Sequence, residues 1–251
     1  MTTRTVLLSV LFGTMSLHAQ SPEQVFQTAN GLFQQGKVAE ARDAYESLVS
    51  KGYVSGELYH NLGNAWYRTG DIARAILNFE RAMRLMPNDE DLKHNLQLMN
   101  LMITDRIEPT PRLFLWEYWE VVTGVFSLNG ITWLAYLFYL VTIAAAIVMV
   151  LGFRYAVRKA ALIGGVVALV LLLVSTTIFI DKWSDAGRTD EAILMAPVTS
   201  VKNSPDPRSS DAFVLHSGVK VRIVDTVASW IKVRIADGKV GWVEQGVVER
   251  I

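Results

Sequence analysis

The sequence predicts a multi-domain membrane protein with three parts: an all-α repeat region, a hairpin of two transmembrane helices and a small all-β barrel. Two segments, 131–153 and 160–180, contain no charged residue, although charged residues make up 19% of the chain. A pattern with a period of 34 residues runs through 22–107, which is typical of stacked helical hairpins. After residue 190 apolar and polar residues alternate over short runs, which indicates strands.

The composition excludes several classes of protein. The chain has 24 Lys and Arg against 24 Asp and Glu, so its charge does not favour a nucleic acid as partner. Cysteine is absent, which excludes a disulfide framework, a thiol nucleophile, a cysteine-bound metal and a lipid-modified N-terminal cysteine. Hydrophobic residues make up 51%, but the surplus is confined to a few segments, so the chain is neither disordered nor fully soluble.

Residues 1–19 are typical of a secretory signal peptide. Arg4 precedes an apolar run at 6–17, and Ala19 is a small residue at a suitable cleavage position. As a helix the run is about 18 Å long, too short for a bilayer core of about 30 Å. An uncleaved membrane anchor is the alternative, and both interpretations place the residues that follow outside the cytoplasm.

The segments 131–153 and 160–180 are predicted transmembrane helices 1 and 2, about 35 Å and 31 Å long. The loop 154–159 between them contains three cations: Arg154, Arg158 and Lys159. A short cationic loop is typical of the cytoplasmic side, so both outer ends of the hairpin are expected outside the cytoplasm.

Small residues recur every four positions in the second segment, at Ala160, Gly164 and Ala168. This spacing allows close helix packing, which favours packing of the hairpin on itself over a site for a partner's helix. Neither segment contains an ionisable side chain, so a proton relay or an ion pathway is not expected.

The better copy of the repeat has Leu62-Gly63 and Trp66 followed by Ala75, Phe79, Ala82 and Pro87, a spacing that resembles the tetratricopeptide repeat. Gly63 and Ala75 are expected to let two helices approach, with Phe79 and Trp66 between them. The first copy, about 22–55, is weaker, and a helix at about 89–105 is expected to cap the array. Residues 20–107 are therefore predicted to hold two repeats and a cap, an array short enough that docking onto neighbours is expected.

The resemblance implies a peptide-binding scaffold whose first helices line a concave groove. Polar residues would face that groove, because an asparagine amide offers a peptide backbone both a donor and an acceptor. The candidates are Asn30, His60, Asn61, Asn64, Tyr67, Arg68, His94 and Asn95. Solvated helix faces and packing between repeats are the alternatives. No metal site is expected, because no carboxylate or third histidine accompanies the histidine pair at ligand spacing.

Residues 108–130 form an aromatic connector in front of the first predicted membrane helix. Trp116 and Trp119 lie in an apolar stretch with few charges, which is typical of an interfacial helix at the lipid headgroups. A helix packed under the repeats is the alternative.

Residues 181–251 are predicted to contain a linker and a small β-barrel of five strands. A loop is expected at 200–211, where Ser, Pro and Asp gather, and a hairpin turn at Asp237-Gly238. The pattern resembles the bacterial SH3-like domain. In that resemblance Trp230 and Trp242 are either ligand-facing aromatics or barrel core, with core favoured for at least one. His216 is expected in a loop.

The whole order of segments resembles the BatE family of bacterial aerotolerance-operon proteins. The resemblance is carried by the runs 91–96 and 105–109 and by the C-terminal Trp and Gly-Trp pattern. It implies a role in oxygen or envelope-stress tolerance. The cationic loop and the signal peptide independently predict a two-span protein of the bacterial inner membrane with both terminal domains in the periplasm. The resemblance also implies partners from the same operon, namely membrane proteins with von Willebrand-type domains and a MoxR-type ATPase.

The sequence contains no recognisable catalytic constellation, and the acidic residues are expected on solvated faces. We therefore expect a non-enzymatic scaffold without a cofactor, anchored in the bilayer, that presents two interaction modules outside the cytoplasm. One alternative is a sensor whose barrel binds a cell-wall peptide. The other is an enzyme with an unrecognised site.

Overall fold

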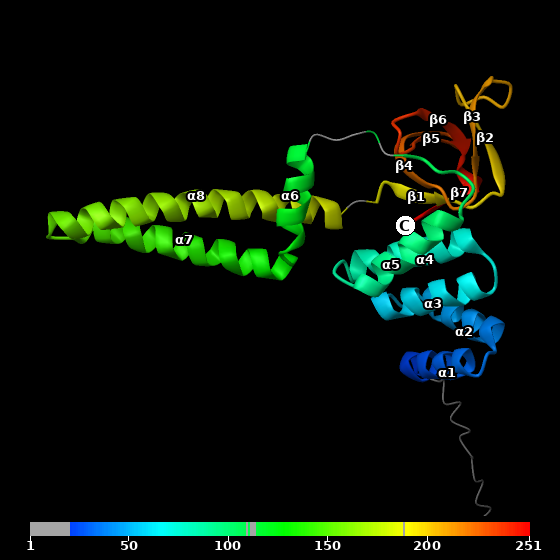
Figure 1. The fold of residues 1–251 in the computed structure, drawn as a ribbon, viewed down its shortest axis with the longest axis horizontal. Coiled ribbons are helices and arrows are strands. Elements are labelled where there is room, and N and C mark those ends of the chain that lie inside the picture. The colour runs from blue at the N-terminus through cyan, green and yellow to red at the C-terminus, as the bar shows by residue number, and fades with distance from the viewer. Residues whose placement is uncertain (1–20, 109, 111–113, 188) are drawn as a thin grey trace, which may run out of the picture.

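The computed structural model describes residues 21–108, 110, 114–187 and 189–251. The expected signal peptide at 1–19 lies outside these residues. Figure 1 shows a helical domain of α1–α5, a long hairpin of α7 and α8 with α6 across one end, and a C-terminal β-domain. The helical domain and the β-domain lie at the same end of the hairpin, although the hairpin separates them in the sequence.

The helical domain is built from two helical hairpins and a fifth helix. Gly36 and Gly70, which the repeat aligns, both adopt left-handed backbone (φ 79° and 92°) just after a helix, a conformation that ends helices and favours glycine. The helices are α1 (Pro22–Gln34), α2 (Val38–Ser50), α3 (Gly56–Arg68), α4 (Ile72–Leu85) and α5 (Glu90–Met102). Four of these helices have an N-cap residue whose side-chain oxygen accepts a hydrogen bond from a backbone N–H of the first turn. These N-cap residues are Ser21, Ser55, Asp71 and Asp89.

The close approach of α3 and α4 depends on Gly63, as the repeat spacing predicts. A Cβ atom at Gly63 would lie 2.7 Å from the ring of Phe79, which is closer than side-chain packing allows. Phe79 is 1% exposed and Ala75 is completely buried, and Trp66 fills the adjacent space. The small residues and the aromatic residues of the repeat therefore have the roles that the sequence suggests.

Helices α7 (Leu128–Leu151) and α8 (Tyr155–Ala186) are long and apolar enough to cross a membrane. Helix α8 extends beyond the charge-free segment at both ends, so the connection between the helices is shorter than the loop 154–159 expected from the sequence. Arg158, in the first turns of α8, donates from Nε to the carbonyl oxygen of Met149 at 2.9 Å. This bond satisfies a carbonyl at the end of α7 and places a cation there, where the helix dipole favours it.

The two long helices pack on each other along part of the small-residue pattern. A Cβ at Gly165 would lie 3.0 Å from Ala145 of α7, and Ala168 is buried, whereas a Cβ at Gly164 would meet open space. Helix α6 (Phe114–Gly124) lies against the hairpin end rather than under the repeats. Its Trp119 donates from Nε1 to Asp181 of α8 at 3.2 Å.

The β-domain is one antiparallel sheet of seven strands in the order β3-β2-β6-β5-β4-β1-β7. The strands are β1 (Glu191–Leu194), β2 (Val198–Lys202), β3 (Asp211–His216), β4 (Lys220–Val227), β5 (Trp230–Arg234), β6 (Val240–Glu244) and β7 (Val248–Arg250). Residues such as Leu194, Val201, Leu215, Ile231 and Val233 form its buried core. The sequence predicts only five strands and a loop at 200–211, whereas the described residues form seven strands. The two additional strands, β2 and β3, flank the Ser- and Pro-rich loop, whose composition obscures their strand pattern.

Helix α4 packs against strand β1 and joins the two domains. Ile193 of β1 is completely buried and belongs to the core of the helical domain, together with Ile76 of α4. Met195 and Ile251 pack against the same core. The β-domain thus covers helix α4 of the short helical array. This agrees with the expectation that the array docks onto a neighbouring part of the chain.

Candidate functional site

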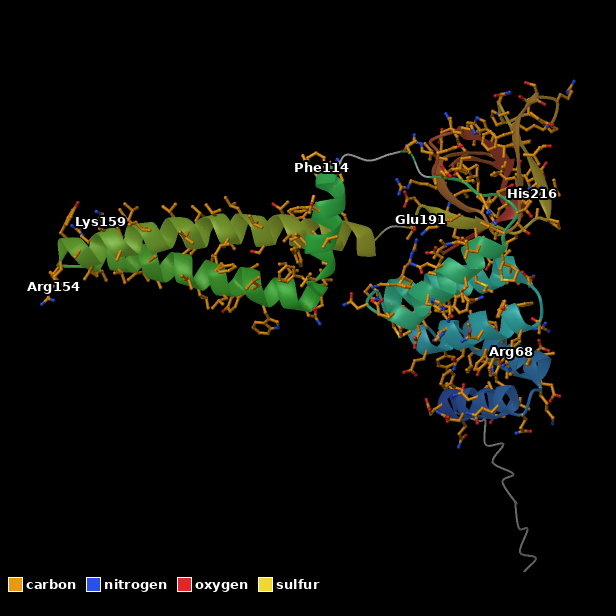
Figure 2. The ribbon with its side chains drawn as sticks, in the orientation of Figure 1. Arg68, Phe114, Arg154, Lys159, Glu191 and His216 are labelled. Atoms are coloured by element: carbon orange, nitrogen blue, oxygen red, sulfur yellow. The ribbon has the colours of Figure 1, made fainter. Side chains whose placement is uncertain are left out.

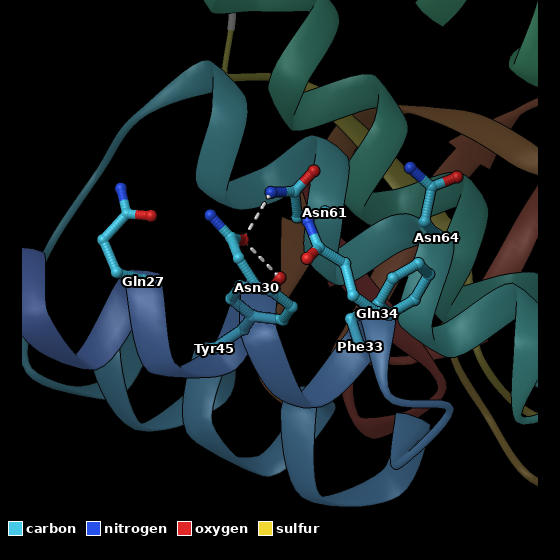
Figure 3. Close-up of a pocket in the computed structure, with 7 residues that line it drawn as sticks. All are labelled: Gln27, Asn30, Phe33, Gln34, Tyr45, Asn61 and Asn64. Atoms are coloured by element: carbon cyan, nitrogen blue, oxygen red, sulfur yellow. Dashed lines mark hydrogen bonds between the residues drawn. The ribbon is translucent and has the colours of Figure 1, made fainter.

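The two first helices of the helical hairpins, α1 and α3, face a polar recess with a volume of about 300 Å³ (Figure 3). Asn30 comes from α1, while Asn61 and Asn64 come from successive turns of α3. The lining residues are Gln27, Asn30, Phe33, Gln34, Tyr45, Asn61 and Asn64. The structure therefore brings three of the eight predicted groove residues together in one recess.

A hydrogen-bonded cluster fixes the floor of this recess. The hydroxyl of Tyr45 donates to Asn30 Oδ1 at 2.6 Å, and Asn61 Nδ2 donates to the same oxygen at 3.0 Å (Figure 3). Burial raises the pKa of Tyr45 to about 12, so its hydroxyl remains a proton donor at neutral pH. The Asn30 oxygen is thus occupied. Among the described side chains, the Asn64 amide has no hydrogen-bond partner and remains available to a ligand.

The other predicted groove residues do not line the recess. The guanidinium of Arg68 stacks 4.9 Å from the centre of the Phe33 ring, so one end of the recess carries a positive charge. His60 Nε2 and Asn95 Nδ2 lie 3.2 Å apart and bond α3 to α5. Tyr67 and His94 are exposed on the surface.

Sequence reasoning missed four of the lining residues, although a signal existed for three of them. Gln27, Phe33 and Gln34 are three or four positions from Asn30, the spacing that places side chains on one face of a helix. Tyr45 lies 34 positions before Phe79, so the period of the repeat indicates a core residue there. Its hydroxyl was given no role there.

The two predicted aromatic residues of the β-domain differ in exposure. Trp230 is only 9% exposed, whereas Trp242 is half-buried. Trp242 is the register partner of Lys232 on β5 and of Lys202 on β2, and the Lys232 Nζ lies 5.8 Å from the centre of its ring. Paired residues share one face of a sheet, so Trp242 has two cations beside it on the face opposite the core residue Val243.

Comparison with known families identifies both folded parts. Residues 56–89, which form α3 and α4, match the tetratricopeptide repeat. Residues 197–249 match the bacterial SH3 domain. No curated protein matches the chain. The protein therefore combines a helical region with a tetratricopeptide repeat, two candidate membrane helices and a C-terminal SH3 domain, and both module types are typically non-catalytic interaction domains.

Charged residues form ion pairs between the helical domain and the SH3 domain. The carboxylates of Glu80 and Glu191 therefore do not lie on the solvated faces that the sequence predicts for the acidic residues. Lys220 lies 2.9 Å from Glu80 of α4 and 3.0 Å from Glu191 of β1. Glu80 and Glu191 are only 16% and 21% exposed. Arg81 and Arg84 of α4 add bonds to the last two residues of the chain, at 2.7 Å to the carbonyl oxygen of Arg250 and at 2.8 Å to that of Ile251.

The interface sets the charge state of these groups. Burial alone would lower the pKa of Lys220, but the charges and hydrogen bonds of Glu80 and Glu191 raise it above its usual value. Burial alone would likewise raise the pKa of Glu191, but Lys220 and Arg84 lower it. Both groups are therefore charged at neutral pH and hold the domains together.

Among the described residues no group of three His, Asp or Glu side chains could hold a metal ion.

Proposed function

We propose that the protein is a non-enzymatic scaffold of a bacterial inner membrane that presents its tetratricopeptide recess and its SH3 domain in the periplasm. The recess of Asn30, Asn61 and Asn64 carries the proposal, because the unpartnered Asn64 amide, held beside the fixed Asn30–Asn61 pair and a cation, suits the backbone of a bound peptide. Docking of the SH3 domain onto α4 gives the repeats a rigid support, which lowers the entropic cost of binding.

The orientation follows from the distribution of charge along the hairpin. Arg154 and Lys159 lie at the end remote from both domains (Figure 2). Short cationic connections stay in the cytoplasm, so the opposite end with both domains would be periplasmic. In this orientation the exposed aromatic residues of α6, such as Phe114 and Trp116, would lie near the lipid headgroups.

The resemblance to the BatE family supports a role in an aerotolerance or envelope-stress complex. In this proposal the partners are membrane proteins with von Willebrand-type domains from the same operon, together with a MoxR-type ATPase system. The recess would hold an extended segment of one such partner. No step of the proposal requires catalysis or a cofactor.

Cross-linking and mass spectrometry of the complex extracted in mild detergent test this function. The wild-type chain should recover membrane partners, with cross-links near α1 and α3. Asn64→Ala, and Asn61→Ala as a second variant, should reduce the recovery of those partners. Asn100→Ala changes an exposed asparagine on α5 and serves as the matched control. Equal recovery with all variants would contradict a role of the recess.

A second candidate function is binding of a cell-wall peptide by the SH3 domain. Trp242 with Lys232 favours it, because an aromatic ring beside a cation suits a peptide that carries carboxylates. The purified full chain should then sediment with isolated cell-wall sacculi, and Trp242→Ala should abolish this sedimentation. Val198→Ala, an exposed apolar position on β2, should leave it unchanged. Sedimentation that does not depend on Trp242 would contradict this candidate.

A further inference from the structure

The SH3 domain does not complete its core with its own strands. Ile103 and Ile107, which follow helix α5, pack against the buried cluster that contains Leu215 and Ile235. Ile103 packs at the same time against the core of the helical domain. A segment that precedes the membrane hairpin in the sequence thus supplies apolar side chains to the domain that follows it.

Polar contacts hold this segment in place between its two isoleucines. The carboxylate of Asp105, 17% exposed, accepts a hydrogen bond from the backbone N–H of His216, and the His216 ring Nδ1 lies 2.9 Å from its other oxygen. His216 is the last residue of β3 and not the loop residue that the sequence suggested. Further along, the N–H of Thr110 donates to the carbonyl oxygen of Ala236 at 3.3 Å.

The surface of the SH3 domain that contacts residues 103–107 fits their side chains closely. A Cβ at Gly218, whose φ is 92°, would lie 2.6 Å from Ile103 Cγ2, so only glycine leaves room for that isoleucine. A recess of about 550 Å³ runs beside the segment, lined on the SH3 side by Phe213, Leu215, Ile235 and Asp237. Strand β3 is the terminal strand of the sheet, so this side of the domain is not covered by another strand.

We propose that the surface covered by residues 103–107 is a peptide-binding surface of the SH3 domain, occupied by this segment as an internal ligand. The segment then shows what a partner must carry: two branched apolar side chains four residues apart and a carboxylate midway between them, as in Ile103, Asp105 and Ile107. A partner peptide of this chemistry binds by displacing the segment. Because Ile103 also packs in the helical core, displacement loosens the docking of the two domains.

The inference goes beyond the scaffold function and does not depend on the asparagine recess. Covalent attachment gives the segment an effective concentration of about millimolar, so a free peptide competes poorly with it. If the segment occupies this surface in about nine molecules of ten, releasing it raises the apparent affinity for the free peptide about tenfold.

The test uses the full chain in detergent and a fluorescent peptide with the sequence of residues 102–108. Asp105→Asn and Ile107→Ala release the segment, and both should bind the peptide about tenfold more tightly than the wild-type chain by fluorescence anisotropy. Arg106→Ala, an exposed position in the same segment, should bind as the wild-type chain does. A peptide with Asn in place of its Asp should bind none of them measurably.

Two outcomes overturn the inference. One is equal peptide affinity for the wild-type chain and the released variants. The other is a released variant that still melts cooperatively and does not bind the peptide. Should a variant fail to fold, hydrogen exchange of the wild-type chain decides. Saturating peptide should speed amide exchange at Thr110, whose N–H loses its bond to the carbonyl oxygen of Ala236, and unchanged exchange contradicts displacement.

Discussion

Lys220 of β4 lies 2.9 Å from Glu80 of α4, although the whole hairpin of α7 and α8 separates the two residues in the sequence. The same ammonium group lies 3.0 Å from Glu191 of β1, so one cation bridges an acid from each domain. The partly buried ion pairs therefore join the tetratricopeptide region and the SH3 domain into one body. In the chain, the helical part of this body precedes α6 and the hairpin of α7 and α8, and the SH3 domain follows them.

Removal of the bridging cation should destabilise the protein. Lys220→Met leaves Glu80 and Glu191 partly buried without their nearest cation, and we expect a loss of about 1–2 kcal/mol in the free energy of unfolding. Lys93→Met breaks an exposed pair within α5, where Lys93 lies 2.7 Å from Glu90, and should cost less than about 0.5 kcal/mol. Chemical denaturation in detergent measures both. Equal losses in the free energy of unfolding would show that the Lys220 bridge stabilises the protein no more than an exposed ion pair does.

The interface should weaken in acid. Lys220 and Arg84 hold the pKa of Glu191 below its ordinary 4.5 against the effect of burial, so the stability that Glu191 contributes is present above that value. It is lost as the pH falls through the lowered pKa. The pKa of Lys220 is raised above 10.5, so its contribution is present below pH 10.5 and is lost only above its raised pKa.

Glu191→Gln tests this pH dependence. Its melting temperature should lie below that of the wild-type chain at pH 7. The difference should shrink as the pH falls below 4.5 and disappear below the lowered pKa of Glu191, where this group is protonated in both states. Glu90→Gln, at an exposed acid of α5, is the control and should follow the wild-type curve. A difference that stays constant from pH 7 to pH 3 would contradict the role of Glu191.

Packing of α3 on α4 should not tolerate a methyl group at Gly63. Gly63→Ala forces the ring of Phe79 away from its buried position, and we expect a loss of about 1–3 kcal/mol. Gly31→Ala in α1 is the matched control, since its new Cβ would meet only Gln35 Nε2 at 4.0 Å. That change should be neutral or should stabilise the helix by up to about 1 kcal/mol. Thermal melts that rank the two variants in the reverse order would refute the packing argument.

The Tyr45 hydroxyl should lose its proton at a higher pH than an exposed tyrosine does. Burial raises its pKa from 10.0 to about 12, so the stability that depends on its protonated hydroxyl is present below pH 10 and is lost between pH 10 and 12. An absorbance titration should show a tyrosinate step at about pH 12 that Tyr45→Phe removes. The exposed Tyr67→Phe should leave that step unchanged. Tyr45→Phe should also cost about 1 kcal/mol, because the bond to Asn30 is lost.

Features that depend on local spacing could be predicted from the sequence. Gly63 and Phe79 belong to one helical hairpin, and the two candidate membrane helices follow from unbroken apolar runs, so a short window contains the whole signal. The bond between Asp105 and His216 joins residues 111 positions apart, and nothing near either residue indicates it. The outer face of α4 likewise has the pattern of a solvated helix, because its charges meet partners only after the SH3 domain folds against it.

The central claim is that both domains lie docked together on the outer side of the membrane, and the cysteine-free chain allows one direct measurement. Arg81→Cys and Glu249→Cys, whose side chains lie 3.1 Å apart across the interface, are combined in one chain that keeps Lys220, Glu80 and Glu191. Spheroplasts that express it are treated with a short, membrane-impermeant thiol cross-linker. Lys159→Cys in a separate chain reports on the cytoplasmic side. The account predicts that the double variant forms an intramolecular cross-link in intact spheroplasts, while Lys159→Cys reacts only after permeabilisation. A double variant that is labelled without cross-linking, or that reacts only after permeabilisation, would contradict it.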